Sequence, residues 1–213
     1  MSMSFATLIA MLDYSSVFIF ALTGALVAAR GQLDPVGFIF FATLTGIGGG
    51  TLRDLVLGRT PVFWINSPEL ILLTAGAALL VFFTAHLLES RYRTLVWLDA
   101  CALAVAVPAG VGVALEAGVN PVAIVVMGMM TGTFGGLMRD VVGNEVPLVL
   151  NHGEFYITAA FGGAAAAVLS VTYGMERGWA LIACGVVVLV LRSGSLIFGW
   201  KLPVYRPRLP PPR

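Results

Sequence analysis

Two short stretches of this 213-residue chain combine clustered glycines with an arginine–aspartate pair. The first, GIGGGTLRD, spans residues 46–54, and the second, GTFGGLMRD, spans residues 132–140. Each follows a long apolar run, where a glycine weakens a helix by roughly 1 kcal/mol relative to alanine and a charge is costly. A membrane helix tolerates such a stretch only where it faces protein or a water-filled cavity. The pattern therefore favours two helices that break or bend at their glycines and line a polar conduit.

The glycines also allow a second interpretation, which is close packing of two helices through small residues. For the charges, we expect Arg53 to pair with Asp140, across the two stretches. By the same symmetry, Arg139 pairs with Asp54. Alternatively, each arginine extends to the membrane surface and ends its helix. The residues assigned to the break and the polar lining are Gly48, Gly49, Gly50, Arg53, Asp54, Gly135, Gly136, Arg139 and Asp140.

Asp13 and Asp99 are two further carboxylates, each flanked by long apolar stretches. We interpret each either as an intramembrane carboxylate that attracts a cation or as a cap at the start of its helix. Hydroxyl oxygens can come from threonines in or next to the two stretches, namely Thr133 and also Thr45, Thr51 and Thr131. Together these side chains predict a conduit that offers oxygen atoms to a cation, with arginines that limit how tightly the ion is held.

The composition excludes an ordinary soluble domain. Hydrophobic residues make up 59% of the chain and charged residues 11%, whereas soluble domains carry roughly 25% charged residues. The net charge of +1, without a basic patch, gives no indication of nucleic-acid binding. The two histidines and two cysteines lack metal-ligand spacing, and no nucleophile–base set occurs. We therefore expect neither an enzyme nor a bound cofactor.

Seven apolar segments are long enough to cross a bilayer, which predicts an all-α polytopic membrane protein. With alternating helices, most basic residues fall on one side, which the positive-inside rule makes cytoplasmic. The N-terminus is then outside and the C-terminus is in the cytoplasm. The segments are Leu8–Ala29, Val36–Leu57, Leu70–Leu88, Leu95–Leu115, Pro121–Val142, Phe155–Tyr173 and Trp179–Phe198.

The chain contains an internal repeat at a fixed offset of 86 residues, the shift that carries Arg53 to Arg139. Because each unit holds three helices, the second unit enters the membrane upside down, an architecture of transporters and channels whose site lies between the repeats. The same shift relates Asp13 to Asp99, Gly24 to Gly110, Pro35 to Pro121 and Asp54 to Asp140. The predicted units are residues 1–94 and 95–176, then a seventh helix at 177–200 and a Pro- and Arg-rich cytoplasmic tail at 201–213.

Two copies of a Gly-rich motif that ends in Arg-Asp, within three plus three plus one helices, resemble the prokaryotic trimeric intracellular cation (TRIC) channels. The domain of that family is also called glycine-transporter-like, and the resemblance covers about residues 14–198. It implies a bacterial inner-membrane homotrimer with one pore in each protomer, in contact with lipids. It also implies permeation of monovalent cations, K⁺ or Na⁺ and chiefly potassium, along kinked second and fifth helices. One departure is Phe134, which stands where the first copy has Gly48 and makes the two halves of the pore unequal.

Three functions fit these features, and a potassium-permeable cation channel is the one that we expect. A secondary transporter of a small solute such as an amino acid shares the inverted repeat, with Arg53 or Arg139 available to hold a substrate carboxylate. Saturable, gradient-coupled uptake would mark that alternative. A non-conducting scaffold would use the glycines only for packing, so that neutralising Asp54 and Asp140 would have no effect.

Overall fold

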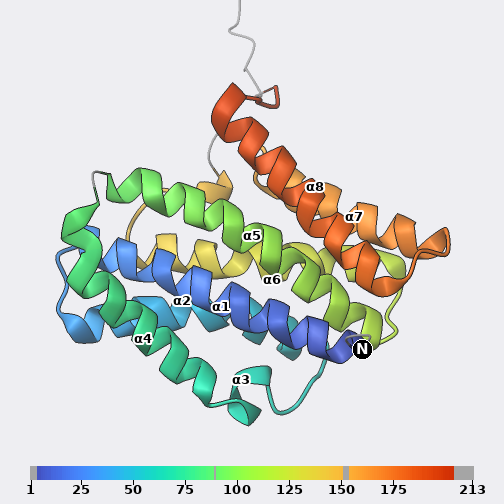
Figure 1. The fold of residues 1–213 in the computed structure, drawn as a ribbon, viewed down its shortest axis with the longest axis horizontal. Helices are drawn as coiled ribbons and strands as arrows, with labels where there is room; N and C mark the ends of the chain where they lie inside the picture. The colour runs from blue at the N-terminus through green and yellow to red at the C-terminus, as the bar shows by residue number, and fades with distance from the viewer. Residues whose placement is uncertain (1–3, 89, 151–153, 204–213) are drawn as a thin grey trace, which may run out of the picture.

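The computed structural model describes residues 4–88, 90–150 and 154–203, and within these ranges the chain is helical, without β-strands (Figure 1). This architecture confirms the predicted all-α membrane fold. The α-helices are α1 (Phe5–Arg30), α2 (Pro35–Val56), α3 (Phe63–Asn66), α4 (Glu69–Thr84), α5 (Arg91–Glu116), α6 (Pro121–Val142), α7 (Ile157–Thr172) and α8 (Arg177–Phe198). The short 3-10 helices are η1 (Ala85–Leu87) and η2 (Leu148–Leu150).

Six helices in the described part of the chain are long and apolar enough to cross a bilayer. They are α1, α2, α4 together with η1, α5, α6 and α8. The sixth predicted segment corresponds to α7, which is apolar but has only 16 residues. The structure adds the short helix α3, which the sequence did not indicate. Seven crossings therefore stay a prediction, of which six meet the length criterion.

The internal repeat reappears in the bounds of the helices. Both α5 and α6 begin and end 86 residues after α1 and α2. The residues before α2 specify where this helix begins. The side chain of Asp34 caps the helix by accepting a hydrogen bond from Gly37 N at 2.8 Å, and Pro35 follows at the first helical position. Asn120 caps α6 in the same way, through the backbone N–H of Ala123 at 2.9 Å.

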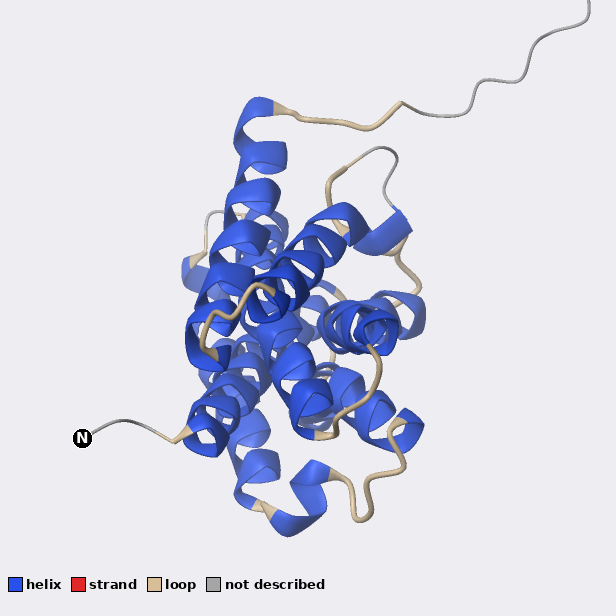
Figure 2. Cartoon of the chain, turned by 90° about the vertical axis from the view of Figure 1, so that its right-hand side faces the viewer, coloured by secondary structure: helices blue, strands red, loops and turns tan. Residues whose placement is uncertain are grey.

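Four helices form the centre of the bundle. In Figure 1, α1 and α5 lie side by side in front of α2 and α6, while α4 flanks one side and α7 and α8 flank the other. Figure 2 shows the same bundle from the side, with short loops between most of the described helices. Arg30 at the end of α1 lies over the ring of Tyr92 at the start of α5, at 5.1 Å. These two helices are therefore antiparallel, as an inverted repeat requires.

Candidate functional site

The first charge cluster is built around Arg53 on α2, whose side chain is fully buried. Its Nη1 donates to Asp13 Oδ1 on α1 at 2.8 Å, and its Nε donates to Asp54 Oδ1 at 2.9 Å. The second oxygen of Asp54 accepts the backbone N–H of Phe63 in α3 at 2.8 Å. The ring of Phe63 lies 5.3 Å from the guanidinium carbon of Arg53. One arginine thus joins three helices through two carboxylates.

The second charge cluster repeats this arrangement around Arg139 on α6. Its Nη1 donates to Asp99 Oδ1 on α5 at 2.8 Å, and its Nε donates to Asp140 Oδ1 at 2.7 Å. The other oxygen of Asp140 accepts the backbone N–H of Leu148 in η2 at 2.9 Å. Arg139 also donates to Thr23 Oγ1 on α1 at 2.8 Å, which links the second cluster to the first repeat.

These contacts correct the predicted pairing of the charges. Arg53 does not meet Asp140, and Arg139 does not meet Asp54, because each arginine pairs with the aspartate that follows it and with one on the preceding helix of the core. The alternative in which the arginines extend to the membrane surface is also wrong, since both side chains are fully buried. Each repeat therefore neutralises its own arginine.

Asp13 and Asp99 lie within α1 and α5, so the interpretation of these residues as helix caps is wrong. The caps are Ser4 and Ser90, whose side chains accept backbone N–H groups in the first turn. Both aspartates instead face the buried arginines, at 2.8 Å in each case. The other interpretation, that of carboxylates within the membrane that attract a cation, stays a prediction.

The glycine clusters bring two helices together instead of breaking them. Each of α2 and α6 is α-helical from end to end, so the predicted break at the glycines is absent, and a bend there stays a prediction. A Cβ on Gly49 would lie 2.2 Å from the carbonyl oxygen of Thr131, and one on Gly135 would lie 2.5 Å from that of Thr45. The two contacts are related by the repeat. At this crossing, the glycines serve the close packing that was the alternative interpretation.

The two remaining clustered glycines of the first stretch, and one of the second, make room for side chains. A Cβ on Gly48 would lie 1.9 Å from the terminal methyl carbon of Met138, and one on Gly50 would lie 2.6 Å from the ring of Phe63. At Gly136, a Cβ would lie 3.2 Å from the hydroxyl of Tyr156. These positions therefore let flanking side chains approach the backbone of α2 and α6.

Several buried polar atoms in the clusters have no hydrogen-bond partner among the described residues. They are Nη2 of Arg53, Nη2 of Arg139 and Oδ2 of Asp99. Buried polar atoms of native proteins usually bind protein or water. The threonine hydroxyls are engaged, since Thr133 donates to Met129 O at 2.8 Å, and Thr131 to Met127 O at 2.7 Å, while their oxygens can still accept. Water inside the bundle would give the unpaired atoms of Arg53, Arg139 and Asp99 the hydrogen-bond partners that they lack, and the threonine oxygens could accept from the same water.

Sequence reasoning missed a third buried arginine, Arg192 on α8. It is fully buried, donates from Nη1 to Glu154 Oε2 at 2.8 Å, and lies 4.9 Å from the ring centre of Tyr156. The sequence did contain an indication, because Arg192 is the single charged residue in the last apolar segment, and a charge within a membrane segment is normally functional or paired. Arg192 has no counterpart in the repeat, so the offset of 86 residues could not reveal it.

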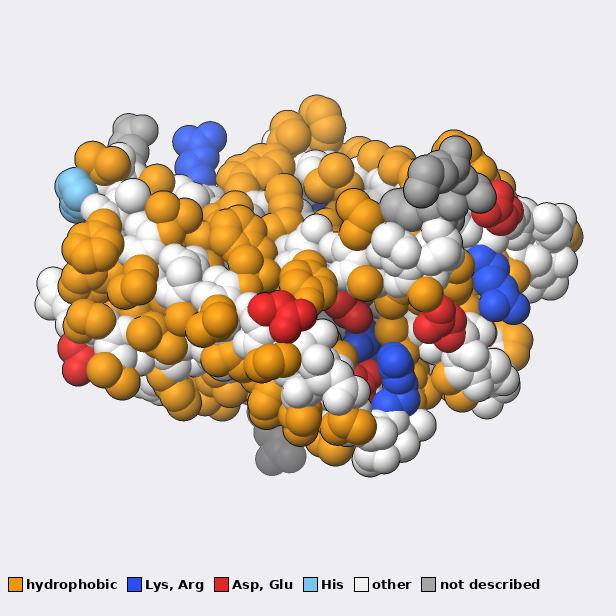
Figure 3. Space-filling model, turned by 60° about the horizontal axis from the view of Figure 1, so that its bottom comes forward, with side chains coloured by type: hydrophobic (Ala, Val, Ile, Leu, Met, Phe, Trp, Pro, Cys, Tyr) orange, Lys and Arg blue, Asp and Glu red, His pale blue; other side chains and the backbone are white. Residues whose placement is uncertain are grey.

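Charged side chains gather around a hollow on one otherwise largely apolar face of the molecule, as Figure 3 shows. Near the first cluster, exposed Arg59 comes within 3.7 Å of Asp54, and Tyr14 donates a hydrogen bond to Glu69. Inside the bundle, a cavity of about 10 Å³ lies between Asp13, the glycines of α2 and Thr131. That volume is close to the minimum for one water molecule. The crossing of α2 and α6 therefore leaves room for about one water molecule beside Asp13.

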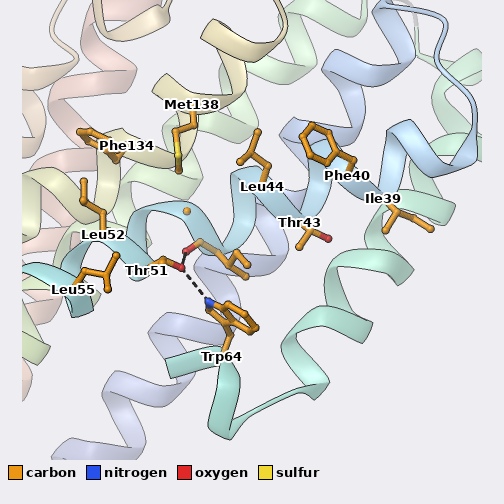
Figure 4. A pocket seen from close by; sticks show the side chains of 12 residues that line it. Ile39, Phe40, Thr43, Leu44, Thr51, Leu52, Leu55, Trp64, Phe134 and Met138 are labelled. Carbon is orange, nitrogen blue, oxygen red and sulfur yellow. Dashed lines mark hydrogen bonds between the residues drawn. The ribbon is translucent and has the colours of Figure 1, made fainter. Parts of the chain in front are cut away.

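A larger apolar groove of about 620 Å³ lies on the other side of that crossing (Figure 4). Phe40 and Leu44 of α2, with Phe134 and Met138 of α6, contribute to its wall. Trp64 of α3 closes one edge, where its Nε1 donates to Thr51 Oγ1 at 3.0 Å. The groove carries no charged side chain, so it is unsuited to an ion and suited to apolar chains.

The chain matches a family model described as "Glycine transporter" twice, over residues 10–86 and 96–172. It is also similar to the inner membrane protein YadS of Escherichia coli (strain K12). The two are 35% identical over 199 residues, which cover 91% of this chain and 94% of the relative.

Two solved structures are similar over almost their whole length. One is the TRIC trimeric intracellular cation channel orthologue from Rhodobacter sphaeroides, with a TM-score of 0.88 and 46% identity. The alignment covers 91% of this chain and 99% of that one. The other comes from work described as the structural basis for conductance through TRIC cation channels. It has a TM-score of 0.83 and 27% identity, and the alignment covers 94% of this chain and 98% of the other.

Proposed function

Since this chain belongs to the prokaryotic TRIC channel family, we propose that it is a potassium-permeable channel for monovalent cations. The resemblance inferred from the paired Gly-rich motifs is thus confirmed. So is the prediction that the chain is not an enzyme, because the solved relatives are described as ion channels. The relative from Rhodobacter sphaeroides is described as trimeric. We extend this to the chain as a homotrimer in which each protomer holds its own pore.

The observation that supports a cation as the permeating ion is the charge balance of the two clusters. Each buried arginine is paired with two aspartates, which gives each of these groups a formal charge of −1, although the exposed Arg59 near Asp54 offsets part of this charge at the first cluster. In a medium of low dielectric constant, a residual negative charge attracts a cation and repels an anion over several ångströms. The inverted repeat places one such charge toward each end of the protomer.

The proposed conduit runs between the two clusters and past the crossing of α2 and α6. The residues assigned to it are Asp13, Gly48, Gly49, Gly50, Arg53, Asp54, Asp99, Thr133, Gly135, Gly136, Arg139 and Asp140. Opening requires the two helices to separate where Gly49 and Gly135 now contact backbone carbonyl groups. The permeating K⁺ or Na⁺ is the cargo of this pathway, and the proposal assigns no cofactor to the chain.

The experiment that tests this function is planar-bilayer recording of the purified protein in asymmetric potassium chloride. Unitary currents that reverse near the potassium equilibrium potential would support a cation channel. A bilayer that shows no unitary currents, together with saturable uptake of glycine or another small solute into liposomes, would contradict the channel proposal. It would favour the transporter that the family model's description suggests.

Asp140→Asn is expected to lower the unitary potassium conductance about tenfold while leaving the assembly intact. The change neutralises the second cluster with little change in shape, and a unit charge about 10 Å from an ion is worth about 1.7 kcal/mol at an effective dielectric constant of about 20. The matched control is Asp34→Asn, because Asp34 is exposed and asparagine caps a helix equally well. Equal currents from both variants would remove Asp140 from the conduit.

The chain is an integral membrane protein, and we propose an inner-membrane location with the N-terminus outside. We further propose residues 1–94 and 95–176 as the two repeat units, 177–200 as the additional helix and 201–213 as a cytoplasmic tail, of which 204–213 lie outside the described residues. In support of this orientation, Arg30, Arg91 and Tyr92 meet at one end of the molecule. Membrane lipids would contact the exposed apolar faces.

This orientation predicts that a green fluorescent protein fused after Arg213 fluoresces in bacterial cells. An alkaline phosphatase fused at the same point should be inactive, because that enzyme matures only outside the cytoplasm. The opposite pair of results would invert the proposed topology and leave the fold unchanged.

A further inference from the structure

The two repeats carry opposite charges at two pairs of matched positions. The last residue of α1 is Arg30, and the last residue of α5, 86 positions later, is Glu116. The same offset relates Arg59, in the turn after α2, to Glu145, in the turn after α6. Because α5 begins beside Arg30 and α2 begins shortly after it, Glu116 and Arg59 lie at the opposite end of the molecule. Each end therefore has one arginine and one glutamate at these positions, with their order exchanged.

The backbone is equivalent at the matched positions. The N–H of Arg59 donates to the carbonyl oxygen of Asp54 at 2.8 Å, and the N–H of Glu145 donates to that of Asp140 at 2.9 Å. The residue directly after α1 and the residue directly after α5 each donate to the carbonyl oxygen four residues earlier, at 2.9 and 3.0 Å. The repeat thus holds the arginine and the glutamate of each end on equivalent stretches of backbone.

In this conformation the ion pair is formed at the second end. There, Nη1 of Arg30 lies 2.7 Å from Oε2 of Glu145. At the first end, Arg59 turns to Asp54 instead, and Glu116 is exposed, without an ion pair among the described residues. An arginine and a glutamate have the same combined reach whichever of the two positions each occupies. Arg59 can therefore bond to Glu116 across the same separation as the pair at the second end.

Arg59 is held only weakly beside Asp54. Its Nη1 lies 3.7 Å from Asp54 Oδ1, beyond hydrogen-bond length, and its side chain is 44% exposed. The same oxygen already accepts from Nε of Arg53 at 2.9 Å, and the other oxygen accepts the N–H of Phe63 at 2.8 Å. An ion pair with an exposed arginine contributes little to stability. Arg59 can therefore leave Asp54 without breaking a buried hydrogen bond.

We propose that Arg59 exchanges between Asp54 and Glu116, and that this exchange sets the charge of the first mouth of the conduit, which lies beside the cluster of Arg53. Beside Asp54, Arg59 brings the formal charge of the cluster from −1 to 0. Paired with Glu116, it leaves the cluster at −1, which favours the entry of a cation. Asp54 is one of the residues assigned to the conduit, so the charge that Arg59 controls lies on the proposed pathway. The inference rests on the proposed channel function.

The other charges near the two clusters do not compensate for the exchange. Glu69 of α4 accepts a hydrogen bond from Tyr14 and contributes a negative charge in either position of Arg59. At the second end, the matched residue of the turn is Glu145, which cannot neutralise Asp140 and pairs with an arginine of α1. The exchanged order of the charges therefore makes the two mouths unequal, with a movable cation at the first.

Arg59→Gln is expected to raise the unitary potassium conductance about twofold at about 0.1 M KCl, for current that enters at the first mouth, because the neutralising charge is lost. The difference from the wild type should vanish at about 1 M KCl, where the Debye length falls from about 10 Å to about 3 Å. Glu116→Gln should lower the same conductance at low salt, because Arg59 then stays beside Asp54. Both side chains are exposed, so neither change removes a buried contact.

The double variant Arg59→Gln/Glu116→Gln tests whether Glu116 acts through Arg59. Without the arginine, the charge of the cluster no longer depends on Glu116, so the double variant should conduct like Arg59→Gln alone. A glutamate that attracted cations by itself would lower the conductance in the Arg59→Gln background as well. That result would overturn the exchange.

Glu176→Gln is the matched control. Glu176 is an exposed glutamate directly before α8, at the same end of the molecule, where Arg177 lies 6.0 Å from the ring centre of Phe5. The variant should conduct like the wild type at both salt concentrations. A loss in Glu176→Gln equal to that in Glu116→Gln would show a general effect of surface charge and would overturn the role of Glu116.

The outcomes separate this inference from the proposed function. If Arg59→Gln and Glu116→Gln both conducted like a wild type that does conduct, the exchange would be overturned and the channel function would stand. A wild type without unitary currents would overturn both. The result that we expect at low salt is a gain in Arg59→Gln, a loss in Glu116→Gln and the gain again in the double variant.

Discussion

Arg139→Met is expected to lower the free energy of unfolding by about 3–5 kcal/mol, because it leaves two buried carboxylates without their common partner. Asp99 and Asp140 are 0% and 3% exposed, so solvent cannot replace the arginine. The variant also loses the hydrogen bond from Arg139 to Thr23, which joins the second repeat to the first. Thermal unfolding of the purified protein, followed by circular dichroism in detergent, should show a midpoint about 10 °C lower than that of the wild type.

A graded series of arginine variants tests the physical cause. Arg53→Met should be less destabilising than Arg139→Met, since Asp13 in the first cluster retains contact with solvent. Arg59→Met should change the free energy of unfolding by only about 0–1 kcal/mol, because Arg59 is 44% exposed and its ion pair with Asp54 is long. Equal midpoints for all three variants would show that water already solvates the buried carboxylates.

Gly49→Ala is the second change with a large expected effect. Its new methyl group would lie 2.2 Å from a backbone oxygen of α6, which cannot rotate away as a side chain can. The two helices must separate, and overpacking of this kind costs about 1–3 kcal/mol, against a gain of about 1 kcal/mol in helix propensity. We expect a lower midpoint of unfolding and, because the crossing is forced apart, a higher open probability in bilayer recordings.

Two further alanine variants serve as an equivalent change and as a control. Gly135→Ala should behave like Gly49→Ala, because the repeat gives it an equivalent contact with the carbonyl oxygen of Thr45 at 2.5 Å. Gly76→Ala in α4 should be neutral or stabilising, since no atom lies within 4 Å of its Cβ position. If Gly49→Ala and Gly76→Ala unfolded at the same temperature, the close contact between α2 and α6 would be refuted.

Most of the fold that could be predicted from the sequence was predicted from the internal repeat. Residues matched at an offset of 86 define helices with the same offset, so α1, α2, α5 and α6 follow from the pattern alone, whereas the burial of their charges was only one of two interpretations. The partner of each arginine did not follow. Neighbouring helix positions such as 53 and 54 point in different directions, so a bond from Arg53 to Asp54 was not expected. It forms because the long arginine side chain turns back and reaches Asp13 as well.

The prediction of a break at the glycines was wrong because it did not account for the difference between water and a bilayer as the solvent of the helix. In water, three glycines would weaken a helix enough to interrupt it. In a bilayer, each peptide group released from the helix would cost several kcal/mol unless another partner were present, so the helix of α2 continues through residues 48–50. Arg192 was missed for a different reason, because the repeat has no second copy of α8 with which to compare it.

The uninterrupted backbone of α2 and α6 determines what kind of discrimination the conduit can perform. Filters that separate K⁺ from Na⁺ by size use rings of backbone carbonyl groups that replace the water around the ion. In both helices, the carbonyl groups along the glycines belong to regular α-helix. What remains for the ion are carboxylate and hydroxyl oxygens and its own water. We therefore expect the proposed passage to sort ions by the sign of their charge, and two hydrated alkali ions of different radius to cross it almost equally well.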